Sequence, residues 1–215
     1  MEAKDIIAAR VAREIEPGSL VNLGIGLPSL VASHVPADMG VYFQSENGVI
    51  GLGARPPEGM EDPRLTDAGG GVVTAVPGAA SIDSAMSFGL IRGGHIDLTV
   101  LGGLQGDATG RLANWMIPGK LVPGMGGAMD LASGAKRVIV AMQHTSRGVS
   151  KFVETCDLPL TSDRPVDMIV TDMAVFKVAD ARLHLIELAA GVTLDALTAA
   201  TGASFTVATD LVAQA

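Results

Sequence analysis

Short apolar runs alternate in this chain with segments of helical pattern, and this alternation restricts the possible folds more than any other feature of the sequence. The runs expected to form strands are LVNL (20–23), GVYFQS (40–45), GVVTAVPG (71–78), IDLTVLGGL (96–104), KRVIVAMQ (136–143), VDMIVTDMAVF (166–176) and SFTVA (204–208). Helices are expected before Pro17, over 29–34, within 81–94, from Met129 onward, and over 192–202 with Thr193 as N-cap and Gly202 as the stop. Buried strands joined by helices favour an α/β fold with an open, mainly parallel sheet and helices on both faces.

The length and charge of the chain limit its architecture and its partners. At 215 residues it is long enough for one well-filled core, and we expect a single domain over residues 1–215. Hydrophobic residues make up 48% of the chain, which is unlike the composition of a disordered protein. The formal net charge of −8 argues against nucleic acid or an anionic membrane as the main partner.

Several classes of protein are not expected from this sequence. No run approaches 18 uninterrupted apolar residues, so no membrane-spanning helix is predicted. The first segment carries charges throughout and has no apolar secretory core. Cys156 is the single cysteine, and the four histidines show no metal-ligand spacing, so neither a disulfide framework nor a metal site is expected. A cytoplasmic location is the simplest interpretation.

One carboxylate, Glu46, stands alone in the uncharged stretch VYFQSENGVIGLG (41–53). It follows an expected strand, and ligands of α/β sheets gather outside the carboxyl ends of strands. Asn47-Gly48 can adopt positive φ at little cost, so the chain can turn sharply there and present the acid to a cleft. From position alone, a solvated turn acid is the more common case, although no basic residue lies within eight positions to pair with it.

Two glycine-rich turns are candidate ligand-binding loops. Gly24 and Gly26 in NLGIGLP would expose backbone N–H groups at the start of a helix, as a phosphate-binding loop does, but a plain strand-to-helix turn fits equally well. Gly126 and Gly127, within GKLVPGMGGAMDL (119–131), could direct N–H groups at a developing oxyanion, or could simply allow close packing.

Several stretches together resemble a known family, in the expected order and over nearly the whole chain. FQSENGVIG (43–51) is similar to the active-site signature of the class I (3-oxoacid type) coenzyme A transferases. The others are NLGIGLP, VPGAASIDSAMSF, IRGGHIDLTVLGGLQ, LANWMIPGKLVPGMGGAMDL, CDLPLT and IVTDMAVF. The match is to the β half of these enzymes. It implies the CoA-transferase (ribose-phosphate-isomerase-like) α/β fold and an α-subunit partner, in a heterodimer or heterotetramer.

The resemblance also implies roles for individual residues. Glu46 would be the nucleophile that attacks the acyl-CoA thioester and carries a covalent glutamyl-CoA thioester. Gly127 would donate its backbone N–H to the oxyanion. The residues that would contact substrate or coenzyme A are Asn22, Gly24, Gly26, Asn47 and Gly126. No metal or bound cofactor is implied, because coenzyme A is a substrate.

Within the family, the chain is most similar to the acetate/acetoacetate enzymes, and next to those that use succinyl-CoA and a 3-oxoacid. Two other functions remain open: an acyl-CoA hydrolase that uses the same Glu46, and a non-catalytic ligand-binding subunit of the same fold. The sequence departs from the usual pattern at Gly106, where valine is usual, at Arg111, and at Asp67, where asparagine is frequent. Asp67 and the loop ARPPEGMEDPR (54–64) follow Glu46 closely enough to influence the choice of acyl group.

Overall fold

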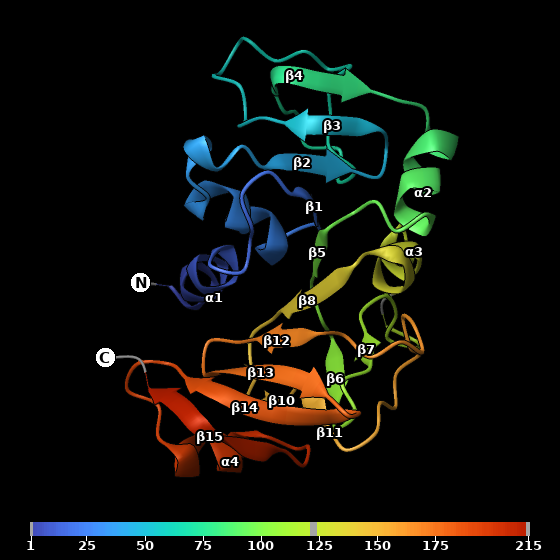
Figure 1. Ribbon diagram of the computed structural model, residues 1–215. Helices are drawn as coiled ribbons and strands as arrows, with labels where there is room; N and C mark the ends of the chain where they lie inside the picture. The colour runs from blue at the N-terminus through green and yellow to red at the C-terminus, as the bar shows by residue number, and fades with distance from the viewer. Residues whose placement is uncertain (1, 121–123, 214–215) are drawn as a thin grey trace.

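A ten-stranded sheet is the central element of the computed structural model, which describes residues 2–120 and 124–213. The strand order is β15-β14-β13-β12-β8-β5-β1-β2-β3-β4, running from the bottom to the top of Figure 1. The strands are β1 Leu20–Leu23, β2 Tyr42–Ser45, β3 Val49–Leu52, β4 Ala75–Ser81, β5 Leu98–Leu101, β8 Arg137–Ala141, β12 Met168–Val170, β13 Ala174–Ala179, β14 Arg182–Leu188 and β15 Thr206–Ala213.

The centre of the sheet is parallel, as the alternation of strands and helices predicts. β2, β1, β5, β8 and β12 run in the same direction, whereas β3 and β4 at one end pair antiparallel. β13 and β14 are also antiparallel neighbours, and β15 pairs parallel with β14. The carboxyl ends of β1, β2 and β5 therefore meet at the same edge of the sheet, where Gly24, Glu46 and Gly102 follow them.

Helices cover both faces of the parallel centre (Figure 1). On one face lie α1 (Ala3–Ala12) and the 3-10 helix η1 (Leu27–His34); on the other lie α2 (Ser84–Arg92) and α3 (Ala128–Gly134). β8 shows the alternation that this arrangement requires: Val138 and Val140 pack into the core that contains α2 and α3, whereas Ile139 packs into the core beneath α1. The strand is buried on both faces, which explains its continuous apolar run.

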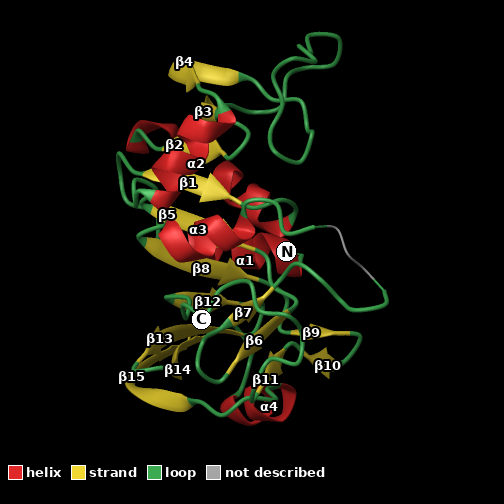
Figure 2. Ribbon diagram, turned by 90° about the vertical axis from the view of Figure 1, so that its right-hand side faces the viewer, coloured by secondary structure: helices red, strands yellow, loops and turns green. Residues whose placement is uncertain are grey.

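Smaller elements complete the chain. A three-stranded sheet joins β11 (Phe152–Val153), β6 (Gln105–Asp107) and β7 (Leu112–Ala113), and β9 (Thr145–Ser146) pairs with β10 (Val149–Ser150). The remaining helices are η2 (Ala37–Met39) and α4 (Leu194–Ala200), where the Thr193 side chain accepts the N-capping hydrogen bond as expected. In Figure 2 these small strands and α4 lie at the end of the molecule opposite β4. Within residues 2–120 and 124–213, no helix combines the length and apolar character needed to cross a bilayer.

Three expectations about the elements were wrong in detail. The run 71–78 is not a buried strand: β4 begins at Ala75 and forms an edge strand whose residues are largely exposed. The run 166–176 is two strands, because the chain turns back after Val170 and pairs with itself. The helix over 29–34 is a 3-10 helix that begins at Leu27. β3 and β14 were not predicted.

Candidate functional site

Glu46 is the first residue of the three-residue loop that joins β2 to β3. Ser45 pairs with Val49 across the hairpin, and the Gly48 N–H donates to the Ser45 carbonyl at 2.9 Å. Gly48 has φ 117°, and a Cβ there would lie 2.0 Å from the Ile82 carbonyl oxygen. Only glycine fits this position, so the Asn-Gly pair does form the sharp turn that presents Glu46 beyond the end of the strand.

A neighbouring segment holds this turn in place. The Asn47 side-chain amide donates to the Thr66 carbonyl at 2.8 Å, and the Ala68 N–H donates to the Ser45 hydroxyl at 2.8 Å. The amide group of Asn47 is thus used to fasten the loop, whereas the residue as a whole is exposed. This contact gives Asn47 a structural role beside the substrate contact predicted for it.

Asn22 lies behind the Glu46 carboxylate and is fully buried. Its Nδ2 is 3.4 Å from Glu46 Oε2, 2.9 Å from Gln44 Oε1 and 3.1 Å from the Gln44 carbonyl. The Thr99 hydroxyl donates to Asn22 Oδ1 at 3.3 Å, so the NH₂ of the amide faces the carboxylate. Asn22 therefore contacts the nucleophile predicted for this site, and it reaches it from inside the protein.

Gly127 approaches the same carboxylate from the other side. It is the buried N-cap of α3, and a Cβ built on it would lie 3.1 Å from Glu46 Cγ and 3.3 Å from both Cδ and Oε1. The absence of a side chain is what lets the backbone come this close. Its neighbour Gly126 is exposed and has φ 50°. Residues 121–123 of the same glycine-rich segment lie outside the described residues.

A cavity of about 1160 Å³ opens in front of Glu46. Gly24 and Gly26 line it together with Glu46, so both glycines of NLGIGLP lie on the wall of the same cavity as the acid. Gly24 packs closely on β5, since a Cβ there would lie 3.1 Å from the Val100 carbonyl oxygen, and Gly26 has φ 85°. The volume is somewhat larger than that of most small-molecule sites, which is about 300–1,000 Å³, so the cavity can admit an extended ligand.

Gln44 and Ser87 are part of this arrangement and were not predicted. Gln44 Nε2 donates to the Ser87 hydroxyl at 2.9 Å and to the Ser45 carbonyl at 2.9 Å, which turns its Oε1 towards Asn22. The period of two along a strand places Gln44 on the same side as Glu46, and this signal could have identified it. Nothing in the sequence links Ser87, which comes from α2, to the site.

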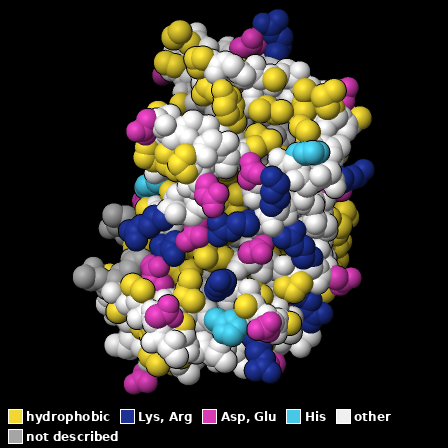
Figure 3. Space-filling view, viewed as in Figure 1, with side chains coloured by type: hydrophobic (Ala, Val, Ile, Leu, Met, Phe, Trp, Pro, Cys, Tyr) yellow, Lys and Arg dark blue, Asp and Glu magenta, His cyan; other side chains and the backbone are white. Residues whose placement is uncertain are grey.

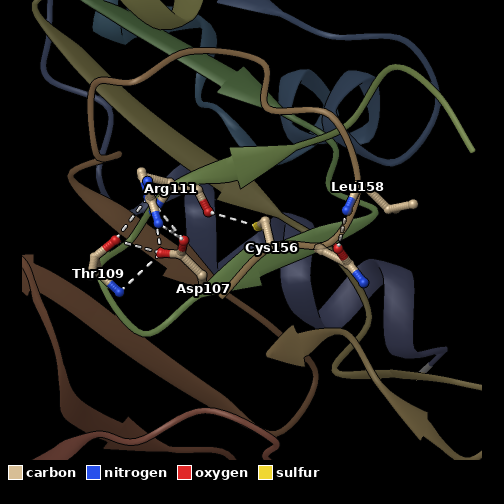
Figure 4. A network of polar contacts seen from close by, with 6 residues as sticks. Asp107, Thr109, Arg111, Cys156 and Leu158 are labelled. Atoms are coloured by element: carbon tan, nitrogen blue, oxygen red, sulfur yellow. Dashed lines mark hydrogen bonds and ion pairs between the residues drawn. The ribbon is translucent and has the colours of Figure 1, made fainter. Parts of the chain in front are cut away.

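Two of the sequence departures, Gly106 and Arg111, have structural explanations in the small sheet. Arg111 Nε donates to the buried Asp107 carboxylate at 2.9 Å, and the Thr109 hydroxyl donates to the same carboxylate at 2.6 Å (Figure 4). These contacts close the turn between β6 and β7. Gly106 faces the core, where a Cβ would lie 3.1 Å from Ile169 Cδ1.

Asp67, the third departure, lines the cavity, and its carboxylate accepts the Gly69 and Gly71 N–H groups, both at 2.8 Å. It therefore adds a second acid to the cavity wall beside Glu46. Asp67 is the departure that lies at the candidate site.

Competing chemistry has little support in the described part of the chain. Burial raises the pKa of the Cys156 thiol to about 11, so this cysteine is a poor nucleophile at neutral pH. No three His, Cys, Asp or Glu side chains among the described residues gather in a way that could hold a metal ion.

Known proteins resemble this chain over nearly its full length. The coenzyme A transferase family matches residues 4–200. The β subunit of the acetate CoA-transferase of Escherichia coli K12 is 52% identical over 212 residues, which cover 98% of this chain and 97% of that protein. The corresponding subunit of the probable succinyl-CoA:3-ketoacid coenzyme A transferase of Bacillus subtilis is 51% identical over 207 residues, which cover 96% of each chain.

A solved structure supports the fold. An acyl-CoA transferase apoenzyme from Escherichia coli O157:H7 matches with a TM-score of 0.80 at 23% identity. The match covers 100% of this chain and 43% of that chain, so this chain spans less than half of that polypeptide. The fold predicted from the resemblance is therefore confirmed, and the chain belongs to the coenzyme A transferase family as a subunit of the β type.

Proposed function

We propose that this chain is the catalytic β subunit of an enzyme that moves coenzyme A between short-chain carboxylic acids through a glutamyl-CoA thioester on Glu46. One observation carries the proposal: the Glu46 carboxylate stands at a large cavity with the Gly127 backbone against one side and the Asn22 amide 3.4 Å from Oε2 on the other. A carboxylate held in this way has lost the freedom that makes free carboxylates poor nucleophiles towards thioesters.

The exchange divides into covalent steps. A Glu46 carboxylate oxygen attacks the thioester carbon of the donor, the C–S bond breaks, and an acyl-glutamyl anhydride and the coenzyme A thiolate form. The thiolate then attacks the glutamyl carbonyl carbon, and the first acid leaves with the anhydride oxygen. The incoming carboxylate attacks the glutamyl thioester, which releases the thiolate again. Attack of that thiolate on the new acyl carbonyl gives the product thioester and restores Glu46.

Each attack passes through a tetrahedral oxyanion that needs a hydrogen-bond donor. We assign the Gly127 backbone N–H to this role, since residue 127 lies against the carboxylate. One well-directed donor of this kind contributes about 3–4 kcal/mol to the stabilisation of the transition state. The scheme uses no metal and no bound cofactor.

The substrates are inferred from the relatives. One is named an acetate CoA-transferase and the other a probable succinyl-CoA:3-ketoacid transferase. We therefore propose acetate, acetoacetate or succinate as acids exchanged by this protein, with the acetate/acetoacetate pair first.

An α-chain partner, in an αβ or larger assembly, is also supported, because both relatives are named as one subunit of their enzymes. Apolar side chains gather on the upper part of the face in Figure 3, where Figure 1 places β2, β3, β4 and α2. Large hydrophobic side chains of these elements are exposed: Tyr42 on β2 is 37% exposed, Val76 on β4 is 36% exposed, and Met86 on α2 is 56% exposed. Exposed apolar surface of this kind is typical of an interface.

Trapping tests the nucleophile. The chain is assembled with its α partner, incubated with acetyl-CoA, and treated with borohydride or hydroxylamine before peptide mapping by mass spectrometry. We expect the modification on Glu46 and loss of both modification and transfer in Glu46→Ala, whereas Glu58→Ala, in the exposed loop 54–64, should behave as the wild type. Modification at another residue, or full transfer by Glu46→Ala, would contradict the proposal. If coenzyme A were released at the same rate in the presence and in the absence of an acceptor acid, the enzyme would be a hydrolase.

A further inference from the structure

Arg55 lies on the wall of the Glu46 cavity, and we propose that its guanidinium forms a subsite for an oxyanion of the substrate. The proposal rests on the transferase function and adds a determinant of substrate choice to it. The ligand group is either the terminal carboxylate of a dicarboxylic acyl group or a phosphate of coenzyme A, which present the same charged oxygens to the guanidinium.

The charges around the cavity favour a cationic side chain on its wall. Among the described residues that line it, Arg55 is the one Lys or Arg side chain, and Glu46 and Asp67 are the acids. Every substrate of the proposed reaction is an anion, and two carboxylates on the wall would repel it. A guanidinium presents donors in a planar fork that matches a carboxylate or phosphate in two-point contact.

The Arg55 side chain is available for a ligand. It is exposed, and no ion pair or hydrogen bond joins its guanidinium to another described residue. Arg64, in the same loop, is different: its guanidinium makes a two-point contact with Asp62 at 2.8 and 3.0 Å. Asp67 makes no ion pair with Arg55 among the described residues, and the hydrogen bonds to its Oδ1 come from the Gly69 and Gly71 N–H groups of its own turn.

The backbone beneath Arg55 is held in place although the side chain is free. The Gly53 N–H donates to the Thr74 carbonyl at 2.7 Å, and both the N–H and the hydroxyl of Thr74 donate to the Ala54 carbonyl, at 2.9 and 2.7 Å. Pro56 follows, is buried, and restricts Arg55 to extended backbone conformations. The Arg55 backbone is therefore already ordered on the cavity wall, so ligand binding requires little loss of conformational entropy in this part of the loop.

Steady-state kinetics on the assembled enzyme test the subsite. Arg55→Gln and Arg55→Lys are compared with Arg64→Gln, a matched arginine whose partner is Asp62. Acetyl-CoA, succinyl-CoA and acetyl-pantetheine, which lacks the nucleotide phosphates, serve as donors. Thermal unfolding checks that each variant is folded.

We expect Arg55→Gln to raise KM about tenfold or more where the oxyanion is present, with partial recovery in Arg55→Lys and no change in Arg64→Gln. An effect confined to succinyl-CoA identifies the terminal carboxylate. An equal effect on both coenzyme A thioesters, absent with acetyl-pantetheine, identifies a phosphate.

Unchanged KM for all donors in Arg55→Gln, or an equal change in Arg64→Gln, would overturn the subsite. The proposed function is judged separately, because it fails only if the wild type shows no transfer or Glu46→Ala retains it. If the wild type is active and Arg55→Gln has unchanged KM values, the subsite is rejected and the proposed transferase function stands.

Discussion

Ser87 on α2 accepts a hydrogen bond from Gln44 at 2.9 Å, and this contact connects a helix to the strand that presents Glu46. Both residues are almost completely buried. The bond fixes which way the Gln44 amide faces, and that in turn fixes the acceptor beside Asn22. Because the Asn22 amide reaches the Glu46 carboxylate, a residue with no contact to the cavity helps to orient the carboxylate through two intervening side chains.

The first prediction concerns this chain of hydrogen bonds. Ser87→Ala leaves a buried Gln44 N–H without its acceptor, which costs about 1–3 kcal/mol. The amide can then rotate, so we expect a several-fold lower kcat with KM little changed, measured on the assembled enzyme. Ser84→Ala, at the exposed start of the same helix, is the control. A Ser87→Ala variant that loses stability but keeps its rate of intermediate trapping would show that Ser87 is only structural.

The second prediction concerns the contact of Gly127 with Glu46. Gly127 has φ −83°, which alanine adopts easily, so Gly127→Ala should leave the helix start intact. The new Cβ would lie 3.1–3.3 Å from the Glu46 side chain and must displace it. We expect at least a tenfold loss of transfer with a near-normal melting temperature.

Gly89→Ala is the control for the second prediction, since residue 89 lies in α2 and a Cβ there would have no atom within 4 Å apart from its own helix backbone. It should keep its activity and gain about 0.5–1 kcal/mol of stability. Equal activity of Gly127→Ala and the wild type would exclude the close approach as a catalytic requirement.

The third prediction separates clash from backbone strain in the active-site turn. Gly48→Ala combines a positive φ with a Cβ 2.0 Å from the Ile82 carbonyl oxygen, whereas Gly18→Ala has φ 74° and no atom within 4 Å. Gly18→Ala should cost about 1–2 kcal/mol of unfolding free energy, the cost of strain alone. Gly48→Ala should cost clearly more and should also abolish transfer, as denaturant titration and activity will show. Similar losses of stability in the two variants would mean that the turn relaxes around the methyl group.

The sequence predicted what depends on local pattern. Within the segment 136–143, residues 138–142 are continuously apolar because β8 is buried on both faces, and Asn47-Gly48 forms the turn that its residues favour. The run 71–78 was wrongly predicted to be a buried strand. Val72 and Val73 precede β4, and Pro77 is tolerated within it because β4 is an exposed edge strand, where a residue without an N–H need not break a ladder hydrogen bond. Burial at an edge depends on what the rest of the chain or a partner covers, and no local pattern encodes it.

At the candidate site, pattern and resemblance predicted Glu46 and its neighbouring glycines but not their supports. Gln44, Ser87 and Thr99 act through hydrogen bonds between residues far apart in the chain, so their roles follow only from the register of β1 with β2 and β5 and from the position of α2. Polar side chains in apolar segments are the sequence sign of such networks, because a buried polar group needs a partner.

The last prediction concerns stability at acid pH and rests on His144. This ring is fully buried, with its two nitrogens each 3.0 Å from a hydroxyl, of Thr171 and Thr201 respectively, and its centroid 4.6 Å from the centroid of the Phe152 ring. Burial lowers the pKa of His144 to about 4, from an ordinary value of 6.5. Between pH 6.5 and pH 4, His144 is therefore protonated in the unfolded chain and neutral in the folded chain. The free energy of unfolding consequently falls as the pH drops from 6.5 towards 4.

If His144 stays neutral in the folded chain across this pH window, the free energy of unfolding should fall by on the order of 3 kcal/mol. Hydrogen bonds lower the pKa of the Glu14 and Asp97 carboxylates, so both also lose stabilising contributions at the acid end of the pH series, in the wild type and in a His144→Gln variant alike. His144→Gln retains hydrogen-bonding capacity without the titration, so its unfolding free energy should change less between pH 6.5 and 4.5 than that of the wild type. Denaturant titrations at a series of pH values measure the difference. Parallel curves for the two proteins would show that another group governs the acid sensitivity.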